Sequence, residues 1–142
     1  MKIKNSLINS LALFLLNEEL NGKESRMRTR FIKILDEREK EISQFRNEIV
    51  QKYGKKDKNG DLVIEDNQYI LEDPVTFNKE MNELMSEEFI IDETESNKEL
   101  LTHIRTILES SKQTFKGTDA FLYDQWCEAF ENMKNEEQSP KE

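Results

Sequence analysis

Reactive side chains are scarce in this chain of 142 residues, which has one histidine, His103, and one cysteine, Cys127. A single cysteine permits no internal disulfide, which suits a reducing cytoplasm, and it excludes a zinc site made of several thiolates. His103 lies at the edge of an apolar helical face and Cys127 lies next to Trp126, so both are expected to be structural. Glycine-rich phosphate loops, nucleophile elbows and helical metalloprotease motifs are also missing. We therefore expect no catalytic residue, no metal site and no cofactor, and a protein that is not an enzyme.

Long hydrophobic runs are missing as well. The longest, Leu11 to Leu16, is far too short to cross a bilayer, and Glu18 and Glu19 follow it closely. Although Lys2 and Lys4 precede this run, no small-residue cleavage site follows it, so a signal peptide is not predicted. We expect no membrane partner.

The apolar residues that are present, 35% of the chain, recur at helical spacing. Asn5 is placed to cap a first, largely buried helix, and Gly22, after Leu20 and Asn21, is placed to end it. A long second helix is predicted from Ser25 to Tyr53, with Gly54 at its end. Three further helices are predicted to begin at Asp73-Pro74, at a capping box from Ser96 to Glu99, and at Gly117-Thr118.

The second helix carries an apolar seam whose positions alternate by four and three residues, as in a coiled coil: Phe31, Leu35, Arg38, Ile42, Phe45 and Ile49. The helix would be roughly 43 Å long, so part of it is expected to project or to be covered by another subunit. Because a charge on a seam is costly unless paired, Arg38 is expected to meet a carboxylate or a partner chain.

The segment from Asp57 to Asp73 has oxygen-bearing side chains at alternate positions, which raises the question of a calcium loop. Such a loop needs glycine at position 6 and glutamate at position 12, where this chain has Leu62 and Gln68. The sequence instead predicts a polar turn followed by a hairpin around Asp66-Asn67, with the run Phe89 to Ile91 as a candidate for an added strand.

Together these patterns predict an α+β fold that is mostly helical, with a long central helix packed by shorter helices and a small β-hairpin. At this length one domain is expected, over residues 1–133, followed by a polar flexible tail over residues 134–142.

Charge is unevenly distributed along the chain. Residues 1–56 carry 13 basic and 8 acidic side chains, whereas residues 57–142 carry 8 basic and 22 acidic ones. The simpler interpretation is that the two oppositely charged parts pack against each other. The alternative is that one of them is a surface for a partner.

The densest basic cluster begins the long helix, where Arg26, Arg30 and Lys33 share one face. Such a face could contact phosphates, but long-range repulsion from the net charge of −9 disfavours nucleic acid as a partner. Conversely, the acidic part could imitate a nucleic acid and occupy the binding groove of an enzyme. The candidate binding residues are Arg26, Arg28, Arg30, Lys33 and Arg38.

Several motifs carry a resemblance: Leu20 to Phe31, the turn from Lys55 to Gly60, and Tyr123 to Glu128. With the long charged helix between the first two, they resemble an uncharacterised family of short proteins from tailed phages and prophages of Gram-positive bacteria. The resemblance extends to about Met133. It implies a phage origin and suits an assembly or virion-associated role, and it assigns no role to any residue.

The leading hypothesis is a non-catalytic phage accessory protein that acts through protein contacts in the host bacterial cytoplasm or in the virion. It could form a homo-oligomer along the seam from Phe31 to Ile49. The second hypothesis is an acidic inhibitor of a host or defence enzyme, and the third is a nucleic-acid binder that uses the basic cluster.

Overall fold

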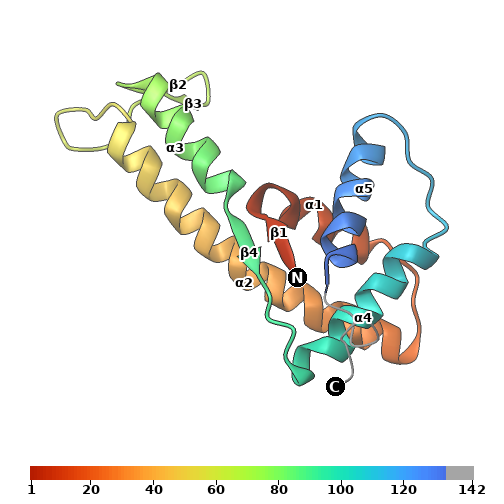
Figure 1. Ribbon diagram of the computed structural model, residues 1–142. Helices are drawn as coiled ribbons and strands as arrows, with labels where there is room; N and C mark the ends of the chain where they lie inside the picture. Colours follow the sequence, from red (N-terminus) through yellow and green to blue (C-terminus); the bar gives the residue numbers. More distant parts are fainter. Residues whose placement is uncertain (134–142) are drawn as a thin grey trace.

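The computed structural model describes residues 1–133, and the predicted tail, residues 134–142, lies outside them. The described chain is mostly helical and has five helices, as predicted, and it also has two small antiparallel sheets (Figure 1). In chain order the elements are β1 (Lys2–Lys4), α1 (Asn5–Leu16), α2 (Gly22–Tyr53), β2 (Ile64–Glu65), β3 (Gln68–Tyr69), α3 (Pro74–Ser86), β4 (Glu88–Ile90), α4 (Glu95–Ser110) and α5 (Thr118–Glu131).

The long helix α2 is the central element and contacts α1, α3 and α4. Phe31, Leu35 and Ile42 on its seam are completely buried within the chain. This part of the seam is therefore occupied by the protein's own core. Beyond Ile42 the seam is less covered, and the side chain of Phe45 is 47% exposed.

Other elements bury α2 more fully at its start than at its end, and on this basis we divide the molecule into two regions. Figure 1 shows them at opposite ends of α2. The body contains α1, α4, α5, the β1–β4 sheet and α2 up to Ile42. The arm contains the rest of α2, the hairpin of β2 and β3, and α3, which lies alongside α2. The residues between α2 and α3, numbers 54–73, form the tip of the arm.

The core of the body combines aliphatic side chains of α1, α2 and α4 with a group of aromatic rings. Phe14 is in contact with Trp126 and Phe115, at ring centroid distances of 5.2 and 5.7 Å. Phe115 and Tyr123 are stacked at 4.3 Å. The rings join α5 and the segment before it to α1, so the long loop after α4 is fixed by apolar packing.

The strand predicted near Phe89 is present, but its predicted partner is wrong. Instead of joining the hairpin, β4 pairs with β1, with Phe89 opposite Ile3. Strand pairing between residues so far apart in sequence leaves no local pattern. The pairing places the start of the chain within the body, where Ile3 is buried.

The hairpin at the tip is confirmed. Ile64 is paired with Tyr69, and the two residues between the strands, Asp66 and Asn67, have positive φ angles of 50° and 63°. Positive φ at both central residues is typical of the type I′ turn, whose twist matches that of the flanking strands. The turn before the hairpin uses Asp57, whose carboxylate accepts hydrogen bonds from the backbone N–H groups of Asn59 and Asp61.

Three predicted helix ends are wrong. The first helix ends at Leu16 rather than near Leu20, and Gly22 begins α2 instead of ending α1. Asn5 is not a cap, because its buried side chain donates to the carbonyl of Leu84 on α3. The capping box beginning at Ser96 is absent, since α4 already begins at Glu95 and no side chain caps it.

Candidate functional site

Three of the predicted binding residues lie free on the surface of α2. Arg26, Arg30 and Lys33 are exposed, and within residues 1–133 they have no hydrogen bond or ion pair. Arg30 and Lys33 border a groove of about 330 Å³ between α2 and the start of α4, whose apolar floor includes Met27, Ile34 and Leu100. We call this the body groove.

Arg28 belongs to the same cluster in sequence, but it is a structural residue. Its guanidinium donates to the carbonyl of Leu15 at 3.2 Å, to the carbonyl of Glu18, and to the hydroxyl of Ser25 at 3.3 Å. The carbonyls at the end of a helix have no partner within it, so Arg28 satisfies the end of α1 and holds it against α2. Arg28 thus has internal partners, and its role in binding stays a prediction.

Arg38 is likewise committed to internal contacts. Its Nε donates to Oδ1 of Asn5 at 3.0 Å, and a second nitrogen lies 3.1 Å from the carboxylate of Glu41. The guanidinium also lies over the ring of Phe89, 5.3 Å from its centroid. The expected carboxylate partner is confirmed. Arg38 lies at a junction between α1, α2, β4 and, through Asn5 and Leu84, α3. Its role in binding stays a prediction.

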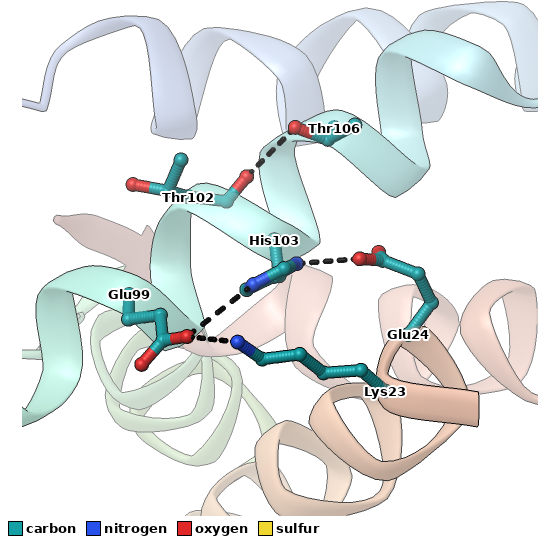
Figure 2. Close-up of polar contacts among 6 residues, drawn as sticks. All are labelled: Lys23, Glu24, Glu99, Thr102, His103 and Thr106. Atoms are coloured by element: carbon teal, nitrogen blue, oxygen red, sulfur yellow. Dashed lines mark hydrogen bonds and ion pairs between the residues drawn. The ribbon is translucent and has the colours of Figure 1, made fainter.

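His103 is at the centre of a polar group that joins α4 to the start of α2 (Figure 2). Its Nδ1 lies 2.5 Å from Glu24, and its Nε2 lies 3.7 Å from Glu99. Lys23 also binds Glu99, and its hydrogen bond is the main cause that holds the pKa of Glu99 below its usual value. His103 is partly buried, as predicted, and its contacts join α4 to α2.

Cys127 packs against the core at the face of α5 that carries Tyr123. Burial raises the pKa of the Cys127 thiol, which disfavours the thiolate that a nucleophile requires. The Tyr123 hydroxyl donates to the carbonyl of Leu108 at 2.6 Å, and burial raises its pKa to about 12. Both groups therefore belong to the packing of α5 on α4.

The arm carries an acidic groove that the sequence did not predict as a site. This arm groove, of about 270 Å³, lies between α2 and α3, and its lining residues are Phe45, Glu48, Ile49, Glu80, Glu83, Leu84 and Glu87. The Glu80 carboxylate accepts from the hydroxyl of Tyr53 at 2.7 Å and lies 3.2 Å from Lys52. The hydrogen bond from Tyr53 is the main cause that lowers the pKa of Glu80.

Three carboxylates of the arm groove are unneutralised. Within residues 1–133, Glu48, Glu83 and Glu87 have no ion pair. The predicted attraction between the basic and acidic parts of the chain is thus realised only in a few places, such as Lys23 with Glu99 and Lys52 with Glu80. In the two grooves, the unpaired cations Arg30 and Lys33 border the body groove, and the unpaired carboxylates line the arm groove.

Exposed apolar side chains mark the far end of the arm. Ile64 and Tyr69 are directly paired across the hairpin and are 58% and 48% exposed. Val75, in the first turn of α3, is 80% exposed. Alternation along β2 and β3 could have indicated one outward apolar pair, whereas the exposure of Val75 depends on how α3 packs on α2.

Residues 1–133 bring no three histidine, cysteine or acidic side chains close enough to hold a metal ion. None of the helices formed by this part of the chain is both sufficiently long and sufficiently apolar to span a bilayer.

A family model described as "Protein of unknown function (DUF1617)" matches residues 1–137. The chain belongs to the DUF1617 family. The predicted resemblance to an uncharacterised family is thereby confirmed for nearly the full length. No curated protein and no solved structure matches this DUF1617 chain.

Proposed function

We propose that this DUF1617 protein is a non-catalytic accessory protein of tailed phages or prophages that works by binding another protein. It would act in the host bacterial cytoplasm, and in virion or tail assembly. The motifs from Leu20 to Phe31 and from Tyr123 to Glu128, which resemble those of phage and prophage proteins, support the origin. The internal contacts of His103 and Cys127 support a role without catalysis.

The exposed apolar pair at the tip is the observation that carries this proposal. Ile64 and Tyr69 sit on an ordered hairpin at the far end of a projecting arm, and each leaves about half of its side chain in solvent. Apolar side chains placed on a projecting, ordered element gain free energy when a partner covers them. The tip is therefore the proposed contact surface.

The test is capture of the partner with the tip altered. The double variant Ile64→Thr, Tyr69→Thr removes apolar area, while threonine keeps the preference for strand. Phe121→Thr, which changes a side chain that is 74% exposed on the body, is the matched control. Each tagged protein is purified from cells in which the phage is produced, and the captured proteins are identified by mass spectrometry.

We expect a protein that copurifies with the wild type and the control to be lost with the tip variant. Circular dichroism and the melting temperature must be unchanged, so that loss of capture reports on contact rather than folding. Equal capture by all three proteins would contradict the tip as contact surface.

A second candidate function is inhibition of a host or defence enzyme by an acidic surface. The unneutralised carboxylates of Glu48, Glu83 and Glu87 in the arm groove favour it. Such a protein should compete with DNA for a nuclease, and the competition should weaken steeply as salt rises. It should also weaken in Glu83→Gln, Glu87→Gln, and competition that is independent of salt would contradict it.

A further inference from the structure

The body groove and the arm groove open on the same side of α2. Met27 and Arg30 border the first, and Phe45 and Glu48 border the second. Met27 and Phe45 are 18 residues apart, as are Arg30 and Glu48, which is five full turns of a helix with 3.6 residues per turn. The two grooves are therefore aligned on one face of α2, about 27 Å apart.

This face has a basic end and an acidic end that cannot neutralise each other within one chain. Arg30 and Lys33 at one end, and Glu48, Glu83 and Glu87 at the other, have no ion pair among the described residues. A separation of about 27 Å is well beyond the screening length of about 8 Å at physiological salt.

Each groove also has apolar lining between its charges. In the body groove, Ile34 is partly exposed beside buried Met27 and Leu100. In the arm groove, Phe45 is exposed and Ile49 partly exposed beside buried Leu84. Glu99 also lines the body groove, but it is paired with Lys23. The unpaired charges of the two grooves are therefore opposite in sign, so the grooves of two copies attract each other.

We propose that a second copy of this chain docks antiparallel along the face of α2, so that the arm groove of each copy covers the body groove of the other. A two-fold axis perpendicular to α2, near residue 39, brings Arg30 of one copy to Glu48 of the other and repeats the contact symmetrically. Two copies satisfy both ends of the face, so the assembly closes as a dimer. This surface includes Phe45 and Ile49 at the less covered end of the seam, and it is separate from the tip.

The same alignment places Glu37 of one copy near Glu41 of the other, close to the axis. Glu41 is already paired with Arg38 at 3.1 Å, which reduces the repulsion. Glu37 has no such partner among residues 1–133. Its charge opposes the dimer, so the variant Glu37→Gln should dimerise more tightly than the wild type.

Charge reversal tests the pairing directly. Sedimentation equilibrium at low salt should show a dimer for the wild type, with an association that weakens as salt is added. Arg30→Glu and Glu48→Arg should each weaken dimerisation about tenfold or more, because each puts like charges opposite each other twice. An equimolar mixture of the two variants should restore the dimer. In the mixed dimer the introduced glutamate of one copy faces the introduced arginine of the other, and the unaltered Arg30 and Glu48 pair as they do in the wild type.

The controls reverse charges elsewhere on the exposed surface. Lys116→Glu and Glu128→Arg give the same changes in net charge without touching the face of α2, and they should dimerise as the wild type does. Melting temperatures of all variants show whether the fold is retained. The tip variant Ile64→Thr, Tyr69→Thr should dimerise normally, so failure of the tip proposal and failure of the dimer are separate results.

Three results would overturn the dimer: a wild type that stays monomeric at high concentration and low salt, single reversals that leave its dimerisation unchanged, or a variant mixture that remains monomeric. Open-ended polymers in place of a dimer would also overturn it, because they require contacts that do not close.

Discussion

The body and the arm share one helix, but different interactions stabilise each region. In the body, α1, α4 and α5 enclose α2 with fully buried side chains such as Phe31, Leu101 and Phe130. In the arm, from residue 43 to residue 86, only Gly54 and Leu84 are buried. The arm depends instead on helix pairing, the hairpin, and the bonds of Glu80 to Tyr53 and Lys52.

This difference indicates that the body supplies most of the stability, whereas the arm exposes most of its surface. Burial of apolar surface is the dominant favourable term in folding, so most of the stability must reside in the body. A region with few buried contacts opens locally at lower free energy than the whole molecule. The arm thus has low local stability and high exposure, which suits the part of a protein that meets partners.

The largest expected effect comes from emptying the core of the body. Phe31→Ala removes a fully buried ring that packs on Phe130 at 5.9 Å, and it should lower the free energy of unfolding by about 3 to 5 kcal/mol. Phe121→Ala, on the surface of the same region, should change it by no more than about 0.5 kcal/mol. Urea unfolding followed by circular dichroism measures both, and equal losses would contradict the division into core and surface.

A smaller effect is expected at the base of the tip. A Cβ added at Gly54 would lie 2.5 Å from Cδ2 of Leu62 and 2.7 Å from the carbonyl oxygen of Val50. Gly54→Ala should therefore cost about 1 to 3 kcal/mol through overpacking. Hydrogen exchange should accelerate for residues 54–73 while amides of α4 stay protected, whereas Lys55→Ala should change neither. Uniform acceleration in the Gly54 variant would show that arm and body do not open separately.

The smallest effect concerns Tyr123 and alkaline pH. Tyr123→Phe loses the hydrogen bond to the carbonyl of Leu108 and should cost about 1 kcal/mol at neutral pH. Since the pKa of Tyr123 is raised from 10.0 to about 12 on folding, its contribution is complete below pH 10.0 and is lost as the pH rises through about 12.

Thermal unfolding at increasing pH checks this expectation, and the variant should lose less stability than the wild type across that range. Tyr69→Phe at the exposed tip is the matched control and should behave as the wild type does. An ultraviolet titration in which all tyrosines ionise together would contradict the raised pKa.

The helices could be predicted because their signals are local. Periodic apolar residues locate all five, Gly54 ends α2, and Asp66-Asn67 indicates the hairpin turn. The partner of β4 could not be predicted, since β1 lies at the start of the chain, far from β4 in sequence, and gives no local cue. The side chain of Asn5 also looked like a cap, because its acceptor, the carbonyl of Leu84, is visible only after folding.

The candidate surfaces were predictable in part for the same reason. Helical spacing placed Arg26, Arg30 and Lys33 together on α2, and the structure keeps them exposed. The same spacing could not separate Arg28 from them, because its acceptors are backbone carbonyls brought close by the turn after α1. The arm groove was missed because Glu48 meets Glu83 and Glu87 only when α3 folds back along α2.

Because α2 is continuous, the number of helical residues between the body and the tip sets both the distance of the tip from the body and the direction in which the tip faces. Deleting one residue after Ile42 would draw the tip inward by about 1.5 Å and swing it by about 100° around the helix axis. Deletions of about seven or eleven residues would nearly preserve its bearing, because they approximate whole numbers of turns. Natural insertions and deletions in α2 should therefore be about seven or eleven residues long wherever the body and the tip must keep the same relative orientation.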